Sequence, residues 1–178
     1  MNKINIYCLI KNHVASLKEN GATSLSKPDL WLHFIFPLIV SLLICLFFKV
    51  MPTSVVGILV NFGSITTALL MSAVVMVYDQ KSKIIEKKEK EIIEDKKETY
   101  SKNIELYNEL CQNICFAILT SIMIVILSVI LSFYDEKVTT SFYSAFFIVI
   151  SFFCYAFFIS TMITFLMILK RFSIILDN

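Results

Sequence analysis

The sequence predicts an all-α membrane protein: four transmembrane helices, with a cytoplasmic helical hairpin between the second and the third. The first observation behind this prediction is four long apolar segments in a chain of 178 residues, 57% of them hydrophobic. About 20 apolar residues in a helix cross the ~30 Å hydrocarbon core of a bilayer. The second observation is a one-sided distribution of basic residues, and the third is a long stretch without helix-breaking residues.

The apolar segments divide the chain into seven parts. In order, the predicted parts are a cytoplasmic N-terminal arm with an amphipathic helix (1–29), the first span (30–50), the second span (54–78), a cytoplasmic hairpin (79–113), the third span (114–134), the fourth span (140–169) and a cytoplasmic tail (170–178). Beside four spans, 178 residues leave no room for a separate soluble catalytic domain.

Basic residues flank the spans mostly on one side, and such a bias sets the orientation of a membrane protein. With the N-terminus inside, fourteen of the sixteen basic residues lie in the arm, the middle segment and the tail, leaving Lys49 and Lys137 outside. We therefore expect both termini in the cytoplasm, with short turns outside. Lysine supplies all basic residues but Arg171, and Ile, Asn and Phe are abundant, as in bacterial genes of low GC content. These features favour the bacterial inner membrane.

The N-terminal arm contains an amphipathic stretch. Tyr7, Ile10, Val14 and Leu17 recur at helical spacing, whereas Lys11 falls on another side of the same helix. Two interpretations stay open: a helix on the inner membrane surface or on a partner, and a helix folded back on the protein's own cytoplasmic part.

The middle segment is predicted to be two helical arms that continue the second and third spans, because no Gly or Pro follows Gly63. A seven-residue spacing on the returning arm predicts a coiled-coil-like seam. The seam comprises Ile93, Tyr100, Ile104, Tyr107, Cys111 and Ile114. The turn is expected near residues 94–99, where Asp95 and Glu98 could cap the returning helix.

The descending arm carries a charged run that cannot bury an apolar stripe. The run is the candidate docking surface for a partner: Glu86, Lys87, Lys88, Glu89, Lys90 and Glu91. Its interleaved acids and bases favour protein contacts over a grip on phosphates, and the net charge of +2 is small, so we expect no direct nucleic-acid binding.

Residues suited to catalysis or metal binding are sparse. The second, third and fourth spans contain no Asp, Glu, Lys, Arg or His, the usual mark of proton relays and intramembrane enzymes. The only histidines, His13 and His33, lie in the arm and at the start of the first span, and His33 is interpreted as an interfacial ring rather than a relay. Cys111 and Cys115, one helical turn apart, are interpreted as packing cysteines rather than a metal site. We expect no enzyme activity, no metal and no cofactor.

Small and polar residues form a stripe on two spans. The candidate helix-packing or oligomer face comprises Gly57, Asn61, Ser64, Ala68 and Ser72 on the second span, and Ala117, Ser121, Ser128 and Ser132 on the third. Small residues let transmembrane helices approach closely, and their hydroxyls bond across helices. Packing within one subunit, a subunit interface and a pore lining all remain open, with Asn61 the member least suited to lipid.

Four spans, short external turns, a cytoplasmic hairpin and a bacterial composition resemble the membrane subunit of the Kiwa anti-phage defence system. The resemblance covers the whole chain but rests on architecture and size, and no short motif carries over a functional residue. It implies a homo-oligomeric inner-membrane sensor, with a tetramer suspected, that recruits a soluble nucleic-acid-binding effector from the cytoplasm.

Three functions are therefore compared: a membrane sensor or anchor that presents its hairpin to a partner, a small pore-forming or depolarising effector, and an enzyme acting on lipid. The sensor or anchor is preferred. The enzyme ranks last, because catalytic groups are missing from the sequence.

Overall fold

The computed structural model describes residues 6–15, 30–135 and 141–176, and the regular structure in these ranges is entirely helical. The elements are α1 (Ile6–Ala15), η1 (Trp31–Ile35), α3 (Phe36–Phe48), α4 (Thr53–Lys90), α5 (Glu94–Leu131) and α6 (Ser141–Leu176). Four stretches are long and apolar enough to cross a membrane: Trp31–Phe48, Thr53–Lys90, Glu94–Leu131 and Ser141–Ile175. The prediction of an all-helical protein with four such helices is confirmed.

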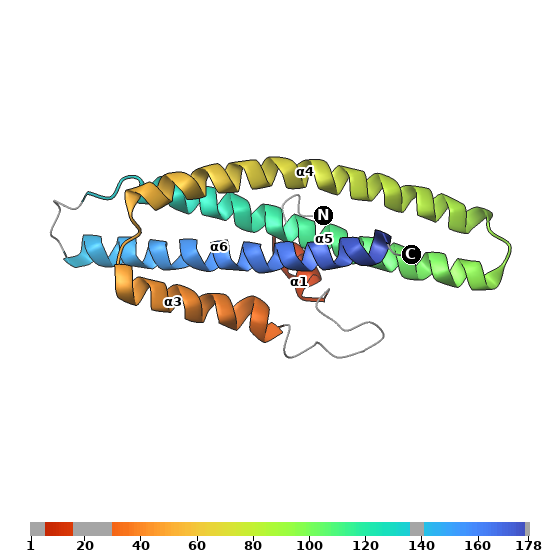
Figure 1. Ribbon diagram of the computed structural model, residues 1–178, viewed down its shortest axis with the longest axis horizontal. Coiled ribbons are helices and arrows are strands. Elements are labelled where there is room, and N and C mark those ends of the chain that lie inside the picture. The colour runs from red at the N-terminus through yellow and green to blue at the C-terminus, as the bar shows by residue number, and fades with distance from the viewer. Residues whose placement is uncertain (1–5, 16–29, 136–140, 177–178) are drawn as a thin grey trace.

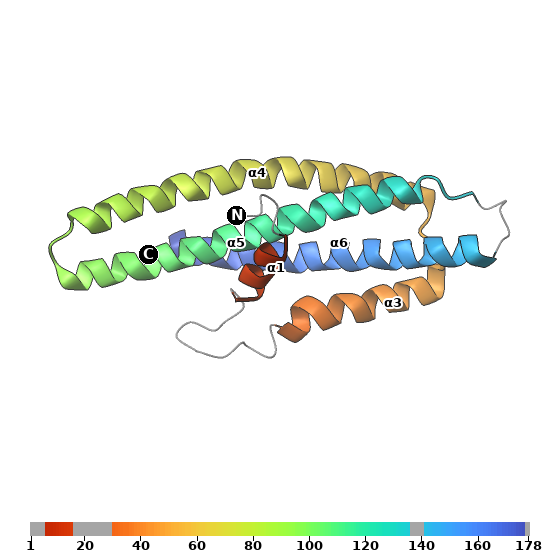
Figure 2. The ribbon, with the colours of Figure 1, turned by 180° about the vertical axis from the view of Figure 1, so that it is seen from behind.

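The four long helices lie side by side in the order α4, α5, α6 and α3 (Figures 1 and 2). Helix α4 packs along α5, α5 along α6, and α6 along the shorter α3. At one end α4 and α5 extend beyond α6, and this part carries the charged residues between Asp79 and Lys102. We call it the charged end.

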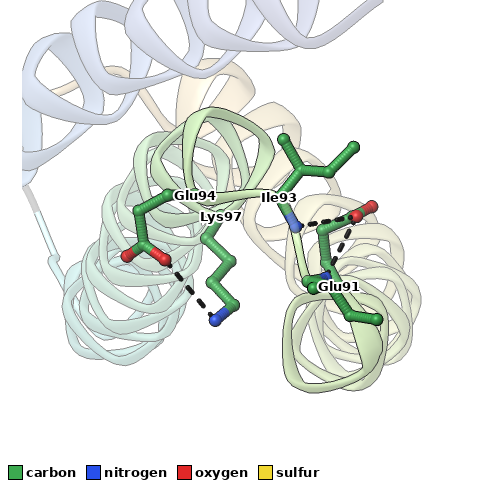
Figure 3. Close-up of polar contacts among 5 residues, drawn as sticks. Glu91, Ile93, Glu94 and Lys97 are labelled. Atoms are coloured by element: carbon green, nitrogen blue, oxygen red, sulfur yellow. Dashed lines mark hydrogen bonds and ion pairs between the residues drawn. The ribbon is translucent and has the colours of Figure 1, made fainter.

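Helices α4 and α5 each run unbroken for 38 residues, as the lack of Gly and Pro predicts. The expected turn near residues 94–99 is wrong, because α4 ends at Lys90 and α5 already begins at Glu94. The carboxylate of Glu91 is the reason: its Oε1 accepts hydrogen bonds from the backbone N–H groups of Ile92 (3.1 Å) and Ile93 (3.2 Å) (Figure 3). Asp95 and Glu98 therefore lie inside α5 rather than at its cap.

Burial increases along the seam on α5 towards the span. Ile93 is exposed, Tyr100 and Tyr107 are half-buried, and Ile114 is fully buried. Ile114 belongs to an apolar cluster that also contains Leu70 and Val77 of α4, Leu110, Ala117 and Ile118 of α5, and Ile168 of α6. The seam therefore packs towards the interior of the helix assembly.

A π-helical turn opens the first span. Pro37 has no backbone N–H, and its ring would clash with the carbonyl of residue 33 in a regular α-helix. The chain widens its turn instead: η1 covers Trp31–Ile35, and the N–H of Phe36 donates to the carbonyl of Trp31, five residues earlier. Pro37 thus distorts the start of the first span into a π-turn that contains His33.

Gly63 lies where α4 comes close to α5. A Cβ atom on Gly63 would lie 2.7 Å from Cγ2 of Val125 and 2.9 Å from the carbonyl oxygen of Ser121. Hydrogen on the Cα is the only substituent that fits without moving the α5 backbone. A Cβ on Gly57, in the same helix, would meet nothing within 4 Å.

We expect Gly63→Ala to destabilise the packing of α4 on α5 by about 1–3 kcal/mol, the usual effect of overpacking a close contact. Gly57→Ala is the matched control, because it makes the same chemical change in open space. Thermal unfolding in detergent, followed by helical circular dichroism, measures both. Equal stability of the two variants would show that this close approach does not limit packing.

A buried histidine cluster at the boundary of the spans

The charged residues of α5 stop at Glu109, and the following residues 110–131 carry no charge. Helix α6 has its own charged pair, Lys170 and Arg171, at the corresponding level. The guanidinium Nη1 of Arg171 lies 2.8 Å from Oε2 of Glu109, and both side chains are largely buried. This ion pair marks the level at which two neighbouring helices change from charged to apolar.

The two histidines of the chain meet just beyond this level. The rings of His13 on α1 and His33 on η1 have centroids 5.2 Å apart. The His13 ring also stacks on Phe116 of α5, with centroids 3.8 Å apart and planes within 3°. His13 is 0% exposed and His33 is 4% exposed. Two residues twenty positions apart in sequence thus form one buried aromatic cluster.

Hydrogen bonds connect the cluster to the two central helices. Nδ1 of His13 lies 3.0 Å from Oδ1 of Asn113 on α5, which accepts the ring proton. Nε2 of His33 lies 3.4 Å from the hydroxyl of Thr164 on α6. The cluster, defined as His13, His33, Asn113, Phe116 and Thr164, therefore joins α1, η1, α5 and α6.

Burial is the main influence on the charge of the cluster. The pKa of His13 falls from 6.5 to about 3, mainly because a charged imidazole loses its hydration there. Repulsion from His33 and Arg171 contributes to this fall, and the hydrogen bond with Asn113 partly opposes it. His13 is consequently neutral at physiological pH while α1 is docked.

The arrangement suits a polar anchor better than a metal site. Within the described residues, no group of three or more His, Cys, Asp or Glu side chains is placed to hold a metal ion. Cys111 and Cys115, one helical turn apart on α5, are partly buried thiols. What the histidine cluster does is hold α1 against α5, because His13 is the one buried residue of that helix.

Sequence reasoning did not predict that the two histidines meet. The sequence indicates an interfacial ring for His33 and no role for His13. One signal does point to the contact: His13 lies within the apolar arc of α1, between Leu9 and Ile6, where an apolar residue is expected. A histidine in such a position points to a polar partner in the surface on which the helix docks.

The small-residue stripe divides into an inner and an outer part. On α5, Ala117, Ser121 and Ser128 are fully buried, and only Ser132 at the helix end is exposed. The stripe on α4 is exposed throughout: Gly57, Asn61, Ser64, Ala68 and Ser72. Helix α4 turns another face towards its neighbours, formed by Val56, Leu59, Gly63, Thr66, Leu70 and Val77. The two parts of the predicted face therefore do not meet within one chain.

Within the spans, hydroxyl groups make polar contacts between α5 and α6. The hydroxyl of Thr161 lies 2.8 Å from that of Thr120, and the Ser128 hydroxyl lies 3.4 Å from the Cys154 sulfur. Ser121 is the exception: its hydroxyl is buried without a hydrogen-bond partner among the described residues. The buried hydroxyls thus contribute to packing within the chain.

The charged run on α4 is largely exposed, with only Lys88 and Glu91 half-buried. Glu86 pairs with Lys90 one turn later (2.5 Å), and Glu91 holds the turn to α5. Lys87 and Glu89 are exposed on the same arm. The run is therefore a solvated surface with mixed charge.

The docking of α1 should weaken as the pH falls, because His13 has a pKa of about 3 when docked and about 6.5 when exposed. The neutral form favours docking, so the contribution of His13 to the docking free energy is fully present above about pH 6.5. This contribution falls by at most ~1.4 kcal/mol per pH unit between pH 6.5 and pH 3. Hydrogen exchange of residues 6–15, corrected for the pH dependence of intrinsic exchange, measures the effect. His13→Ala should expose the amides of α1 to exchange at every pH, whereas the control Asn12→Ala should behave like the parent. If the protection of these amides in the parent protein does not depend on pH, the prediction is wrong.

Comparison of the chain with protein-family models, curated proteins and solved structures gave no match. The resemblance to the Kiwa membrane subunit thus stays an expectation from architecture and size. What this chain shows directly is four apolar helices compatible with a multi-pass membrane protein.

Proposed function

We propose that this protein is a non-catalytic sensor or anchor subunit of a bacterial anti-phage defence complex in the inner membrane. It assembles with itself and recruits a soluble cytoplasmic effector through the charged end of α4 and α5. The one-sided distribution of basic residues supports placing this end, and both termini, in the cytoplasm. The resemblance to the Kiwa membrane subunit supports the defence role.

The observation that carries the proposal is the projection of α4 and α5 beyond the level where the spans end. The ion pair of Glu109 with Arg171 marks that level, and α5 starts fifteen residues earlier, at Glu94. The projecting helices lie outside the apolar segments and carry two exposed isoleucines at their turn. Ile92 is 89% exposed and Ile93 is 52% exposed. An apolar tip on a water-facing element is typical of a protein-binding surface.

Charges around the tip favour a protein partner over a nucleic acid. Most of them are neutralised within the same helix: Lys83 lies 2.7 Å from Asp79, and Lys102 lies 2.9 Å from Glu98. Such exposed pairs contribute little to stability. The surface therefore alternates between positive and negative charge. Such a surface selects and orients a protein partner, whereas binding to a phosphate backbone requires an excess of positive charge.

Self-assembly is supported by the outer face of α4. Asn61 is exposed there, eight residues from the start of the helix and within its apolar part. A carboxamide in contact with lipid is unfavourable, whereas hydrogen bonds between helices make it favourable. Ser64 and Ala68 lie along the same face and let a second helix approach closely.

We expect the double variant Ser64→Leu and Ala68→Leu to weaken self-assembly, because two leucines would hold a second helix away from this face. Both positions are exposed in the single chain, so its own packing should be unchanged. Native mass spectrometry of the protein in detergent measures the oligomer distribution. Ile65→Leu, also exposed on α4, is the matched control and should assemble like the parent. A parent protein that is entirely monomeric would sink the assembly proposal.

Changes at the charged end should abolish recruitment of the partner. We expect Ile92→Asp, and separately the double variant Glu86→Lys with Glu89→Lys, to reduce recovery of the partner at least tenfold, equivalent to about 1.4 kcal/mol of binding energy. Glu91 is left intact because it holds the turn. Pull-down of the full-length protein from its host, with quantitative mass spectrometry, measures recovery.

The double variant Glu105→Lys with Asp135→Lys is the matched control for charge. It makes the same change in net charge at exposed positions outside the charged end, and it should retain the partner. Parent-level recovery with Ile92→Asp and with the α4 double variant would refute docking at this surface. A membrane-potential dye then tests the alternative function, a small pore-forming or depolarising effector.

A further inference from the structure

Helix α1 contacts the protein mainly through one flank of its apolar arc. Consecutive helical residues are about 100° apart, so the arc contains, in order, Leu9, His13, Ile6, Ile10, Val14 and Tyr7. His13 is buried and Leu9 is half-buried against the rest of the chain. On the other flank Val14 is half-buried, but Ile6 is 50% exposed, Tyr7 75% and Ile10 37%.

The contacts of His13 place α1 at the level where the spans begin. Its ring partners are Asn113 and Phe116, four and seven residues into the apolar side of Glu109, the last charged residue of α5. Its other neighbour, His33, lies in the first turn of the first span. Figure 2 shows α1 lying across α5, beside the start of α3. The helix therefore lies at the boundary between the apolar and charged parts of the assembly.

We propose that α1 is an interfacial helix whose exposed flank, formed by Ile6, Tyr7 and Ile10, inserts among the membrane lipids next to the first span. The statement that these lipids belong to the cytoplasmic leaflet rests on the proposed function; the insertion itself does not. The histidine cluster supplies the protein half of the attachment, and the acyl chains below the headgroups supply the other half. A tyrosine at this level has its ring among acyl chains and its hydroxyl among headgroups.

Lipid accounts for the exposed flank better than water or a second copy. Trp31, 50% exposed, lies two residues from His33 and continues the uncovered apolar surface onto the first span. The rest of the helix surface, the polar side, is exposed and carries, in order, Lys11, Ala15, Cys8 and Asn12. Three side chains on a ten-residue helix offer far less than the ~800 Å² per partner of a stable protein interface. An amphipathic helix of this kind lies in the membrane plane.

Tryptophan fluorescence tests the proposal on the full-length protein. Trp31 is the only tryptophan, so Trp31→Phe provides a silent background. In that background, Tyr7→Trp reports on the apolar flank and Asn12→Trp on the polar side. The proteins are reconstituted into vesicles of phosphatidylcholine and phosphatidylglycerol that are brominated near the top or near the end of the acyl chains. Iodide is added as a quencher from the water.

We expect the Tyr7→Trp fluorophore to be quenched several-fold more by bromine near the top of the chains than the Asn12→Trp fluorophore, and less by iodide. Equal iodide quenching of both would mean that the flank faces water, and would overturn the proposal. Protection from bromine and iodide together would mean that protein covers the flank, and would also overturn it. Ile10→Trp, on the same flank, replaces Tyr7→Trp if that variant does not fold. The fluorescence outcomes do not depend on whether pull-downs recover a soluble partner. The proposed function and the interfacial position of α1 can therefore fail independently.

Discussion

The position of α5 between its neighbours is the constraint on which the rest of the structure depends. Leu110, Ile114 and Ile124 of α5 are 0% exposed, and the helix contacts α1, α4 and α6. Gly63 brings α4 close to it, and Thr120 faces Thr161 of α6. Helices α3 and α4 pack mainly from one side and leave apolar faces uncovered. Since no hydrophobic force joins helices within lipid, such close contacts and internal hydrogen bonds must hold them together.

Polar groups inside the assembly are connected rather than scattered. Threonine and serine hydroxyls bond to carbonyl oxygens of their own helices, as Thr164 does to Ser160 (2.9 Å) and Thr67 to Gly63 (2.7 Å). The histidine cluster differs, because it attaches α1 and η1 to the central helices. An imidazole buried at the end of the spans is stable only when neutral and hydrogen-bonded. The attachment of α1 therefore depends on protonation of His13.

The charged end and the apolar parts of the helices differ in the side chains that they expose. In the proposed arrangement the spans and α1 lie in the membrane, and the projecting parts of α4 and α5 lie in water. Exposed side chains follow this division: Leu69 and Val75 lie on the apolar part of α4, whereas Lys87 and Glu89 lie on its charged part. One unbroken helix joins the two environments. A partner bound at the turn would thus be mechanically connected to the spans, as a sensor or anchor requires.

Length, hydrophobicity and the absence of Gly and Pro after Gly63 determined from sequence alone that this chain forms four long apolar helices, because these are local properties of the residues. The tertiary structure decided which faces meet. It turned the small-residue stripe of α4 outwards and that of α5 inwards, although the two spacings are alike. It placed the turn at Glu91, whose carboxylate accepts the free N–H groups. It also brought His13 to His33, since the contact depends on the docking of α1 across α5 and on the π-turn before Pro37, and no periodic pattern encodes such a long-range contact.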